Sequence, residues 1–282
     1  MEHSAIQHTA AAIAYIESHL TERISLDAIA CGAHLSKYHL HRMFTSILGI
    51  TPHCYIQRRQ LTEAAKLLAF SPKPILEIAL EAGYGSQQAF AGVFKSMYKK
   101  TPMEFRKNQW FYPLQLEFSL HKTPSPPDAM DCHIAYAAFQ DIPDWMDFVS
   151  LIIDGFPCFD AAEHLERLKC AIRQGQALIM RDNGIIAGAM AFSPLSGNID
   201  FFGIHPQYRQ YGIAKIFLDF LMCGPLADRK ISITTFRKGD KADTGQRAAY
   251  KQLGFLESEL LTEYGYPAQR LILPPNMLQN TP

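Results

Sequence analysis

The 282-residue chain lacks the features of a secreted or membrane-embedded protein. Its six cysteines form no Cys-x-x-Cys pair, and no basic, apolar, small-residue leader precedes them. No uninterrupted apolar run approaches the roughly 18 to 20 residues that a membrane-spanning helix needs. We therefore expect a soluble, cytoplasmic protein with no membrane role.

The chain also lacks net charge, but its two halves differ. The 27 Lys and Arg residues balance 27 Asp and Glu residues. Residues 1–107 hold 12 of the basic and 8 of the acidic residues, a net charge of +4, whereas the remainder holds 15 and 19, a net charge of −4. Because a domain averages about 150 residues, this length and this asymmetry predict a basic domain followed by an acidic one.

One helical unit occurs twice between Leu26 and Phe105. Its residues recur 49 or 50 positions later: Leu26, Ile29, Ala30 and Ala33 as Ile75, Ile78, Ala79 and Ala82, and Ser36, Phe44, Thr51 and Pro52 as Ser86, Phe94, Thr101 and Pro102. In each copy a helix with apolar residues at i, i+3 and i+4 leads through a short turn to a Ser that can cap a second helix. The pattern predicts two helix-turn-helix units, joined by a longer helix over Pro52 to Ala69.

The second helix of each unit, Lys37 to Leu48 and Gln87 to Lys99, exposes side chains suited to DNA. Arg can bond guanine, Gln can bond adenine, and Lys steadies phosphates. The expected contacts are Lys37, Tyr38, His41, Arg42, Gln87, Gln88 and Lys95. Ordinary solvated surface explains any one of them equally well, but the repeated set favours double-stranded DNA, with two helices in major grooves about 34 Å apart. We expect no metal site, because no Cys or carboxylate joins the nearby histidines at ligand spacing.

The second unit also carries a run of residues that is typical of one family. The run consists of Ile78-Ala79, Gly83-Tyr84, Ser86, Phe90, Phe94-Lys95, Thr101-Pro102 and Phe105-Arg106. Through it, residues 6–107 resemble the DNA-binding domain of the AraC/XylS transcription regulators. The resemblance implies that Tyr38, His41, Arg42, Gln87 and Gln88 read bases of a promoter or operator. Family members often carry Arg or another polar residue where this chain has Gly92, which implies more phosphate contact and less base reading by the second helix.

The helical pattern stops after Lys107. An aromatic stretch opens at Trp110-Phe111-Tyr112, and residues 122–127 are rich in proline. We place a DNA-binding domain at 1–107, a linker at 108–130 and a second domain at 131–282. The aromatic cluster is either a stacking platform for nucleic acid or, as we favour, an apolar contact with a neighbouring domain.

The second domain alternates strands with helices, so the fold class predicted for the chain is multidomain: all-α, then α/β with a mixed sheet. Strands are expected at 132–139, 177–180, 185–192, 199–204, 231–236, 256–261 and 270–273, and helices at 145–153, 161–172, 215–222 and 245–253. Strand 199–204 leads into Arg209, Gln210, Tyr211, Gly212, Ile213 and Ala214, just before a helix. Backbone N–H groups at a helix start suit a pyrophosphate, although this spacing alone is a weak signal.

This order of elements, the loop 209–214 and Tyr250 placed four residues before Gly254-Phe255 resemble the GNAT N-acetyltransferases over residues 131–274. The resemblance implies acetyl-CoA as cosubstrate and an amine acceptor whose identity stays open. It places the pyrophosphate on the backbone of 209–214 and the pantetheine arm along Phe202, Gly203 and Ile204. Tyr250 then falls where the family's general acid protonates the leaving thiolate.

An amine that attacks a thioester must also lose a proton to a base. Asp200 is our candidate, against the commoner reading of a strand-surface carboxylate. His205 could serve instead, but directly before Pro206 it more readily shapes the turn. Core packing is the competing interpretation for Tyr250. Three functions stay open: a regulator that N-acetylates an amine, a regulator whose second domain only senses acyl-CoA or another ligand, and an enzyme tethered to DNA.

Overall fold

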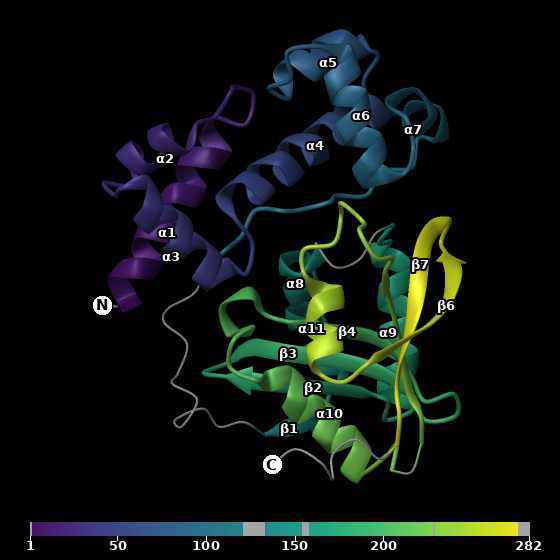
Figure 1. Cartoon of the computed structure of the whole chain (residues 1–282). Coiled ribbons are helices and arrows are strands. Elements are labelled where there is room, and N and C mark those ends of the chain that lie inside the picture. Colours follow the sequence, from purple (N-terminus) through teal and green to yellow (C-terminus); the bar gives the residue numbers. More distant parts are fainter. Residues whose placement is uncertain (1, 121–132, 154–157, 228, 276–282) are drawn as a thin grey trace. The chain divides into compact units, whose positions relative to one another are not determined.

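The structure is a computed structural model that describes residues 2–120, 133–153, 158–227 and 229–275 (Figure 1). The chain divides into two compact units, Met1–Thr123 and Pro124–Pro282. The expected order, an all-helical part followed by a mixed α/β part, is confirmed. Within the described ranges no helix is long and apolar enough to cross a membrane.

The first unit consists of helices with short connections. They are α1 (Glu2–Ser18), α2 (Leu26–Gly32), α3 (Lys37–Leu48), α4 (Pro52–Phe70), α5 (Ile75–Glu81), α6 (Gln87–Tyr98) and α7 (Pro102–Asn108). Ser36 and Ser86 cap α3 and α6 through their side-chain oxygens, and Thr51 and Thr101 cap the helices that follow. The repeated Ser and Thr-Pro signals therefore fix the same helix starts in both copies.

Each helix-turn-helix unit has its own core. In the first, Leu40 and Phe44 of α3 are fully buried together with Ile16 of α1. In the second, Phe94 packs against Tyr98 and Phe105, with ring centroids 4.4 and 5.3 Å away. Such close ring contacts add to the free energy gained by burying apolar area.

Residues 109–120 extend along the first unit and belong to it. The Arg58 guanidinium of α4 donates a 2.6 Å hydrogen bond to the Leu114 carbonyl, and the Thr62 hydroxyl accepts from the Leu114 amide. The Tyr112 ring is 2% exposed and packs against Tyr98, 5.1 Å between centroids. The linker expected at 108–130 therefore does not begin at residue 108, since tertiary hydrogen bonds order this segment; residues 121–130 lie outside the described ranges. The expected apolar contact of the aromatic cluster is confirmed for Tyr112.

The second unit is built on one seven-stranded sheet. Its strands are β1 (Ile134–Tyr136), β2 (Ala177–Asp182), β3 (Ile185–Ser193), β4 (Asn198–Ile204), β5 (Ile231–Phe236), β6 (Leu256–Glu263) and β7 (Tyr266–Leu273), in the order β1-β2-β3-β4-β5-β7-β6. Neighbours are antiparallel except for the parallel pair of β4 and β5. The first strand is shorter than expected, because the Asp141 carboxylate accepts from the Ala138 amide and a 3-10 turn begins at Phe139.

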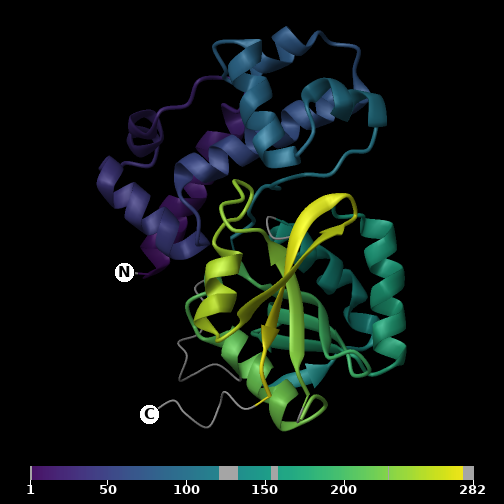
Figure 2. The ribbon, with the colours of Figure 1, turned by 45° about the vertical axis from the view of Figure 1, so that its right-hand side comes forward.

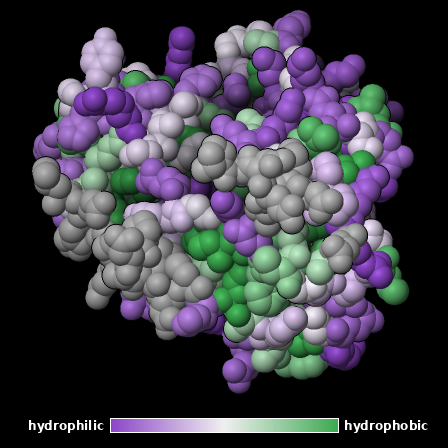
Figure 3. Space-filling view, turned by 60° about the horizontal axis from the view of Figure 1, so that its bottom comes forward, coloured by the Kyte–Doolittle hydropathy of each residue, from purple (hydrophilic) through white to green (hydrophobic). Residues whose placement is uncertain are grey.

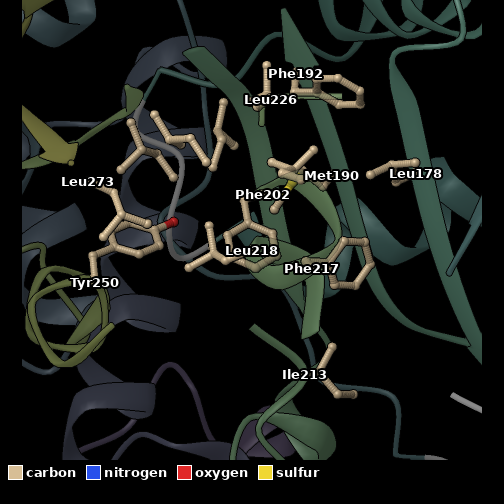
Figure 4. Packing of buried hydrophobic residues seen from close by; sticks show 14 of the residues in the cluster. Leu178, Met190, Phe192, Phe202, Ile213, Phe217, Leu218, Leu226, Tyr250 and Leu273 are labelled. Atoms are coloured by element: carbon tan, nitrogen blue, oxygen red, sulfur yellow. The ribbon is translucent and has the colours of Figure 1, made fainter. Parts of the chain in front are cut away.

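Helices cover both faces of this sheet (Figures 1 and 2). Helices α8 (Ile142–Leu151) and α9 (Ala161–Arg173) bury Trp145 and Leu168 against one face. Helices α10 (Ile213–Cys223) and α11 (Gln246–Gln252) bury residues such as Phe217 and Tyr250 against the other face (Figure 4). In the view of Figure 3, the largest group of hydrophobic residues lies below the centre, with hydrophilic residues below it and to its right.

The sheet opens between β4 and β5. These strands pair only near their starts, at Asn198 with Ser232 and Ile199 with Ile233. On its other side β4 pairs with β3, where the register shift leaves Asp200 as an extra residue. A β-bulge of this kind bends a strand and redirects its side chains. The parting of β4 from β5 and the bulge at Asp200 together shape the site described below.

Candidate functional site

All seven residues expected to contact DNA lie at the surface of the first unit. The exposed positions are Lys37, Tyr38, His41 and Arg42 on α3, and Gln87, Gln88 and Lys95 on α6. Tyr38 is 74% exposed, and the Lys37 ammonium lies 5.8 Å from its ring centroid and 3.5 Å from Asp27. An exposed tyrosine beside a cation on a well-packed helix is available to a partner, which fits base or phosphate contact.

The helix α4 holds the two helix-turn-helix units apart. Its 19 residues correspond to about 28 Å of helix, close to one turn of duplex DNA. Several polar side chains of α4 are buried and bonded to neighbouring segments, including Arg58, Arg59 and Thr62. Hydrogen bonds from buried polar groups of this kind favour one defined arrangement of the helices that they join.

Gly92 of α6 is exposed, and a Cβ atom placed there would meet no other atom within 4 Å. Packing therefore does not require a glycine at this position. The departure from the family pattern removes a side chain from the exposed face of α6 without changing the fold around it.

A cavity of about 320 Å³ lies in the second unit where β4 and β5 part. Asp200 and Phe202 of β4, Thr234 of β5, Tyr250 of α11 and Tyr264 of the β6–β7 turn line it, together with the start of α9. The volume is at the lower end of the range of small-molecule sites. The fold thus brings the two predicted catalytic residues, Asp200 and Tyr250, to one cavity.

Tyr250 is 6% exposed, and its ring packs against Phe202 and Phe255. Burial raises the pKa of its phenol, Asp243 adds to the rise, and Arg209 opposes it. The phenol therefore stays protonated near neutral pH. In the described part of the chain its hydroxyl has no hydrogen-bond partner, and Figure 4 shows the oxygen directed away from α11. The ring of Tyr250 thus packs in the core, as the competing interpretation expects, and its hydroxyl makes no hydrogen bond within the described residues.

Asp200 is exposed and accepts a 2.6 Å hydrogen bond from the Asn198 amide nitrogen. His205 is 1% exposed, and its Nδ1 accepts from the Gln207 amide at the start of a 3-10 turn, Pro206–Tyr208. The expectation that His205 shapes the turn is confirmed. Asp200 is therefore the better placed of the two candidate bases.

The predicted pyrophosphate loop lies at the start of α10 and is not part of the cavity wall. Gly212 caps α10 with a left-handed backbone, φ 71°, and a Cβ atom there would meet nothing within 4 Å. Arg209 and Gln210 are exposed, whereas Ile213 is buried in the core. The loop thus exposes Arg209, Gln210 and Gly212 at the start of α10, where backbone N–H groups suit an anion.

Among the residues expected along the pantetheine arm, Phe202 lines the cavity, and Gly203 and Ile204 do not. The side chain of Ile152 fills the place where a Cβ atom on residue 203 would lie. Gly203 is therefore needed for the packing of the segment after α8 against the sheet.

Sequence reasoning missed several residues that build the site. The Tyr208 hydroxyl donates a 2.7 Å hydrogen bond to the buried Asp182 carboxylate and anchors the loop before α10 to the β2–β3 turn. His164 and Glu163 of α9 and Glu263 of β6 line the cavity. These residues belong to no local motif. The only local signal in this region is Asp160, whose side chain caps the start of α9.

Comparisons with known proteins match the first unit. A family model described as a helix-turn-helix domain matches residues 29–108. The regulatory protein SoxS of Escherichia coli strain K12 is 37% identical over 94 residues, which are 33% of this chain and 88% of SoxS. The right origin-binding protein of the same strain is 39% identical over 97 residues, 34% of each protein, so the chain spans about a third of that relative. The chain belongs to the AraC-type helix-turn-helix regulators.

Two solved structures are also similar to parts of this chain. The DNA-binding domain of AdpA in complex with a target DNA is 26% identical and covers 36% of this chain and 90% of that chain, with a TM-score of 0.34. An acetyltransferase of the GNAT family from Bacillus cereus ATCC 10987 is 15% identical and covers 50% of this chain and 96% of that chain, with a TM-score of 0.40.

Proposed function

We propose that the protein is a promoter-binding transcription regulator whose second unit transfers an acyl group from acetyl-CoA to an amine. The DNA-binding part of the proposal rests on the family and on the exposed faces of α3 and α6. The transferase part rests on one observation: Tyr250, which is 6% exposed and whose hydroxyl has no hydrogen-bond partner among the described residues, lines the cavity that also holds Asp200.

A phenol that lines a cavity and makes no hydrogen bond to the protein can bond a ligand that enters there. In the proposed reaction Asp200 takes, directly or through a water, the proton that the amine loses as its nitrogen bonds to the acyl carbon. Tyr250 gives its proton to the sulfur as the carbon–sulfur bond breaks. The raised pKa suits this role, since a proton donor must still hold its proton at the working pH.

The cosubstrate would supply the acyl group and a thiol leaving group. The residues that would hold it are the loop Arg209–Ala214, through backbone N–H groups at the start of α10, and the strand residues Phe202, Gly203 and Ile204. Two features support this fit: the open space around Gly212 and the Tyr208–Asp182 hydrogen bond that holds the loop. Arg209 of the loop opposes the rise in the pKa of Tyr250, so the loop and the phenol interact electrostatically.

Release of free thiol from acetyl-CoA, measured against a panel of amines, tests the transferase proposal. Tyr250→Phe keeps the ring and removes only the hydroxyl, so the rate should fall by roughly 10² to 10⁴, with acetyl-CoA binding retained. Tyr136→Phe, which removes a phenol from the exposed strand β1, serves as the control and should change neither quantity. A wild-type protein that binds acetyl-CoA yet releases no thiol with any amine would overturn the transferase proposal in favour of a ligand sensor.

A further inference from the structure

The cavity wall of the second unit carries mostly acidic charge. Asp160 and Glu163 at the start of α9, Asp200 of β4 and Glu263 of β6 line it, and Arg167 is the only Lys or Arg among the lining residues described. Burial lowers the pKa of His164 to about 4, and Arg167 adds to this effect, so the imidazole is neutral near pH 7. The wall therefore has a formal charge of −3, which attracts cations.

These carboxylates come from three separate elements around one space. In Figure 2 the β6–β7 ribbon runs between α11 on one side and α9 on the other. The unpartnered Tyr250 hydroxyl lies in the wall of the same cavity, which marks the space as a ligand site independently of the acidic residues. A ligand that reaches Tyr250 and Asp200 with one nitrogen thus has Glu163 and Glu263 near the rest of its length.

The wall already holds one cation on an aromatic face. The Arg167 guanidinium lies 5.2 Å from the ring centroid of Tyr264 and 2.6 Å from the Glu163 carboxylate. This contact joins α9 to the turn between β6 and β7. A carboxylate beside an aromatic face is the combination that holds organic cations by charge and by cation–π attraction.

We propose that the acyl acceptor is a small organic polycation, an amine with at least two protonated nitrogen atoms before reaction. This inference rests on the transferase proposal for the identity of the reacting nitrogen. That nitrogen gives one proton to water as it becomes the free amine and a second to Asp200 as it bonds to the acyl carbon. The other charged nitrogens lie among Asp160, Glu163 and Glu263. The cavity of about 320 Å³ limits the acceptor to a small molecule.

The test uses the full chain with spermidine, n-butylamine, glutamate and a lysine peptide as probes. Thiol release from acetyl-CoA reports transfer, and calorimetry without acetyl-CoA reports binding. We expect spermidine to bind and to be acetylated with a kcat/KM at least tenfold above that of n-butylamine, and glutamate to be inactive. Equal use of n-butylamine, or preference for the lysine peptide, would overturn the inference and leave the transferase proposal standing.

Glu263→Gln and Glu259→Gln form a matched pair on β6. Glu263 lines the cavity and accepts a 3.0 Å hydrogen bond from Thr234, which a glutamine oxygen can also accept. Glu259 pairs with Arg270 and is not part of the wall. Loss of the Glu263 charge should weaken spermidine binding about tenfold, the effect of one partly screened ion pair, whereas Glu259→Gln should leave spermidine binding unchanged.

The binding arm separates the two proposals. Spermidine binding that weakens in Glu263→Gln but not in Glu259→Gln supports the polycation site, even if no thiol is released and the transferase proposal fails. Spermidine binding that is unaffected by Glu263→Gln, or equally affected by both substitutions, would overturn the site.

Discussion

Arg59 of α4 and Glu17 of α1 form a buried, two-pronged ion pair. The guanidinium Nε and Nη2 donate to the two carboxylate oxygens at 2.9 and 2.7 Å, and the Tyr55 hydroxyl donates to the same carboxylate at 2.6 Å. This pair joins the helix between the two helix-turn-helix units to the helix that covers the first of them. The neighbouring carboxylate of Glu17 and the hydrogen bonds raise the pKa of Arg59, which keeps it charged despite its burial.

Glu17→Gln should destabilise the first unit by about 3 kcal/mol, because it removes the buried countercharge of the guanidinium and leaves only the more exposed Glu63. Glu63→Gln is the matched control: Glu63 pairs with the same Arg59 but is 42% exposed, so its loss should cost less than about 1 kcal/mol. Urea unfolding followed by near-ultraviolet circular dichroism measures both. Equal losses in the free energy of unfolding for the two substitutions would contradict the prediction that the buried pair stabilises the unit more than the exposed pair.

Arg42→Ala should relax sequence preference at one base pair and cost on the order of 1 to 3 kcal/mol in binding to a specific promoter site. Arg23→Ala removes the same charge from an exposed position before α2 and serves as the control. Both variants lower the charge of the first unit equally, but only Arg42→Ala should change base preference. The measurement is a binding series over single-base variants of the site, repeated at several salt concentrations. A uniform loss for Arg42→Ala across all sequences would indicate a phosphate contact instead.

Gly212→Asp should weaken acetyl-CoA binding at least tenfold relative to Gly212→Asn. Both substitutions meet the same left-handed backbone, which Asn and Asp tolerate best, and both enter open space. They differ in one negative charge at the helix start, where a pyrophosphate would lie. Calorimetric titration of the full chain measures the difference. Equal affinities of the two variants would show that the pyrophosphate binds elsewhere.

His164 should make the second unit less stable as the pH falls from about 6.5 to about 4. Burial lowers the pKa of His164 to about 4, so in this window the unfolded chain binds a proton that the folded chain does not bind. Stability is therefore complete above the unfolded pKa and is lost by up to about 3 kcal/mol on acidification. The Trp145 indole N–H donates a 3.1 Å hydrogen bond to His164 Nε2, which protonation would break.

Trp145 is a convenient reporter for this effect, since the chain has two tryptophans. Urea unfolding by fluorescence in a Trp110→Phe background at pH 7, 5.5 and 4.5 gives the stability of the second unit. His164→Gln, which keeps an acceptor for the indole and has no group that titrates here, provides the comparison. The same acid loss in both proteins would assign the effect to carboxylates instead.

Local signals in the sequence determined the helices, the strands and the exposed faces of α3 and α6. Caps, turns and apolar periodicity act within a few residues. Ser36 and Ser86 therefore mark the starts of α3 and α6, and Asn183-Gly184, both with positive φ, form the β2–β3 turn. The exposed positions of Tyr38, Arg42, Gln87 and Gln88 followed from the same periodicity, because burial of one helix face fixes which residues remain outside.

Only the tertiary structure decided the cavity and the course of residues 109–120. Asp160, Asp200, Tyr250 and Glu263 lie on four different elements, and they meet because β4 and β5 part after two pairs and because the bulge turns Asp200. The segment after α7 follows α4 because Arg58 and Thr62 bond its backbone more than fifty residues away along the chain. Contacts of this range depend on packing and strand register, which no local pattern of residues specifies.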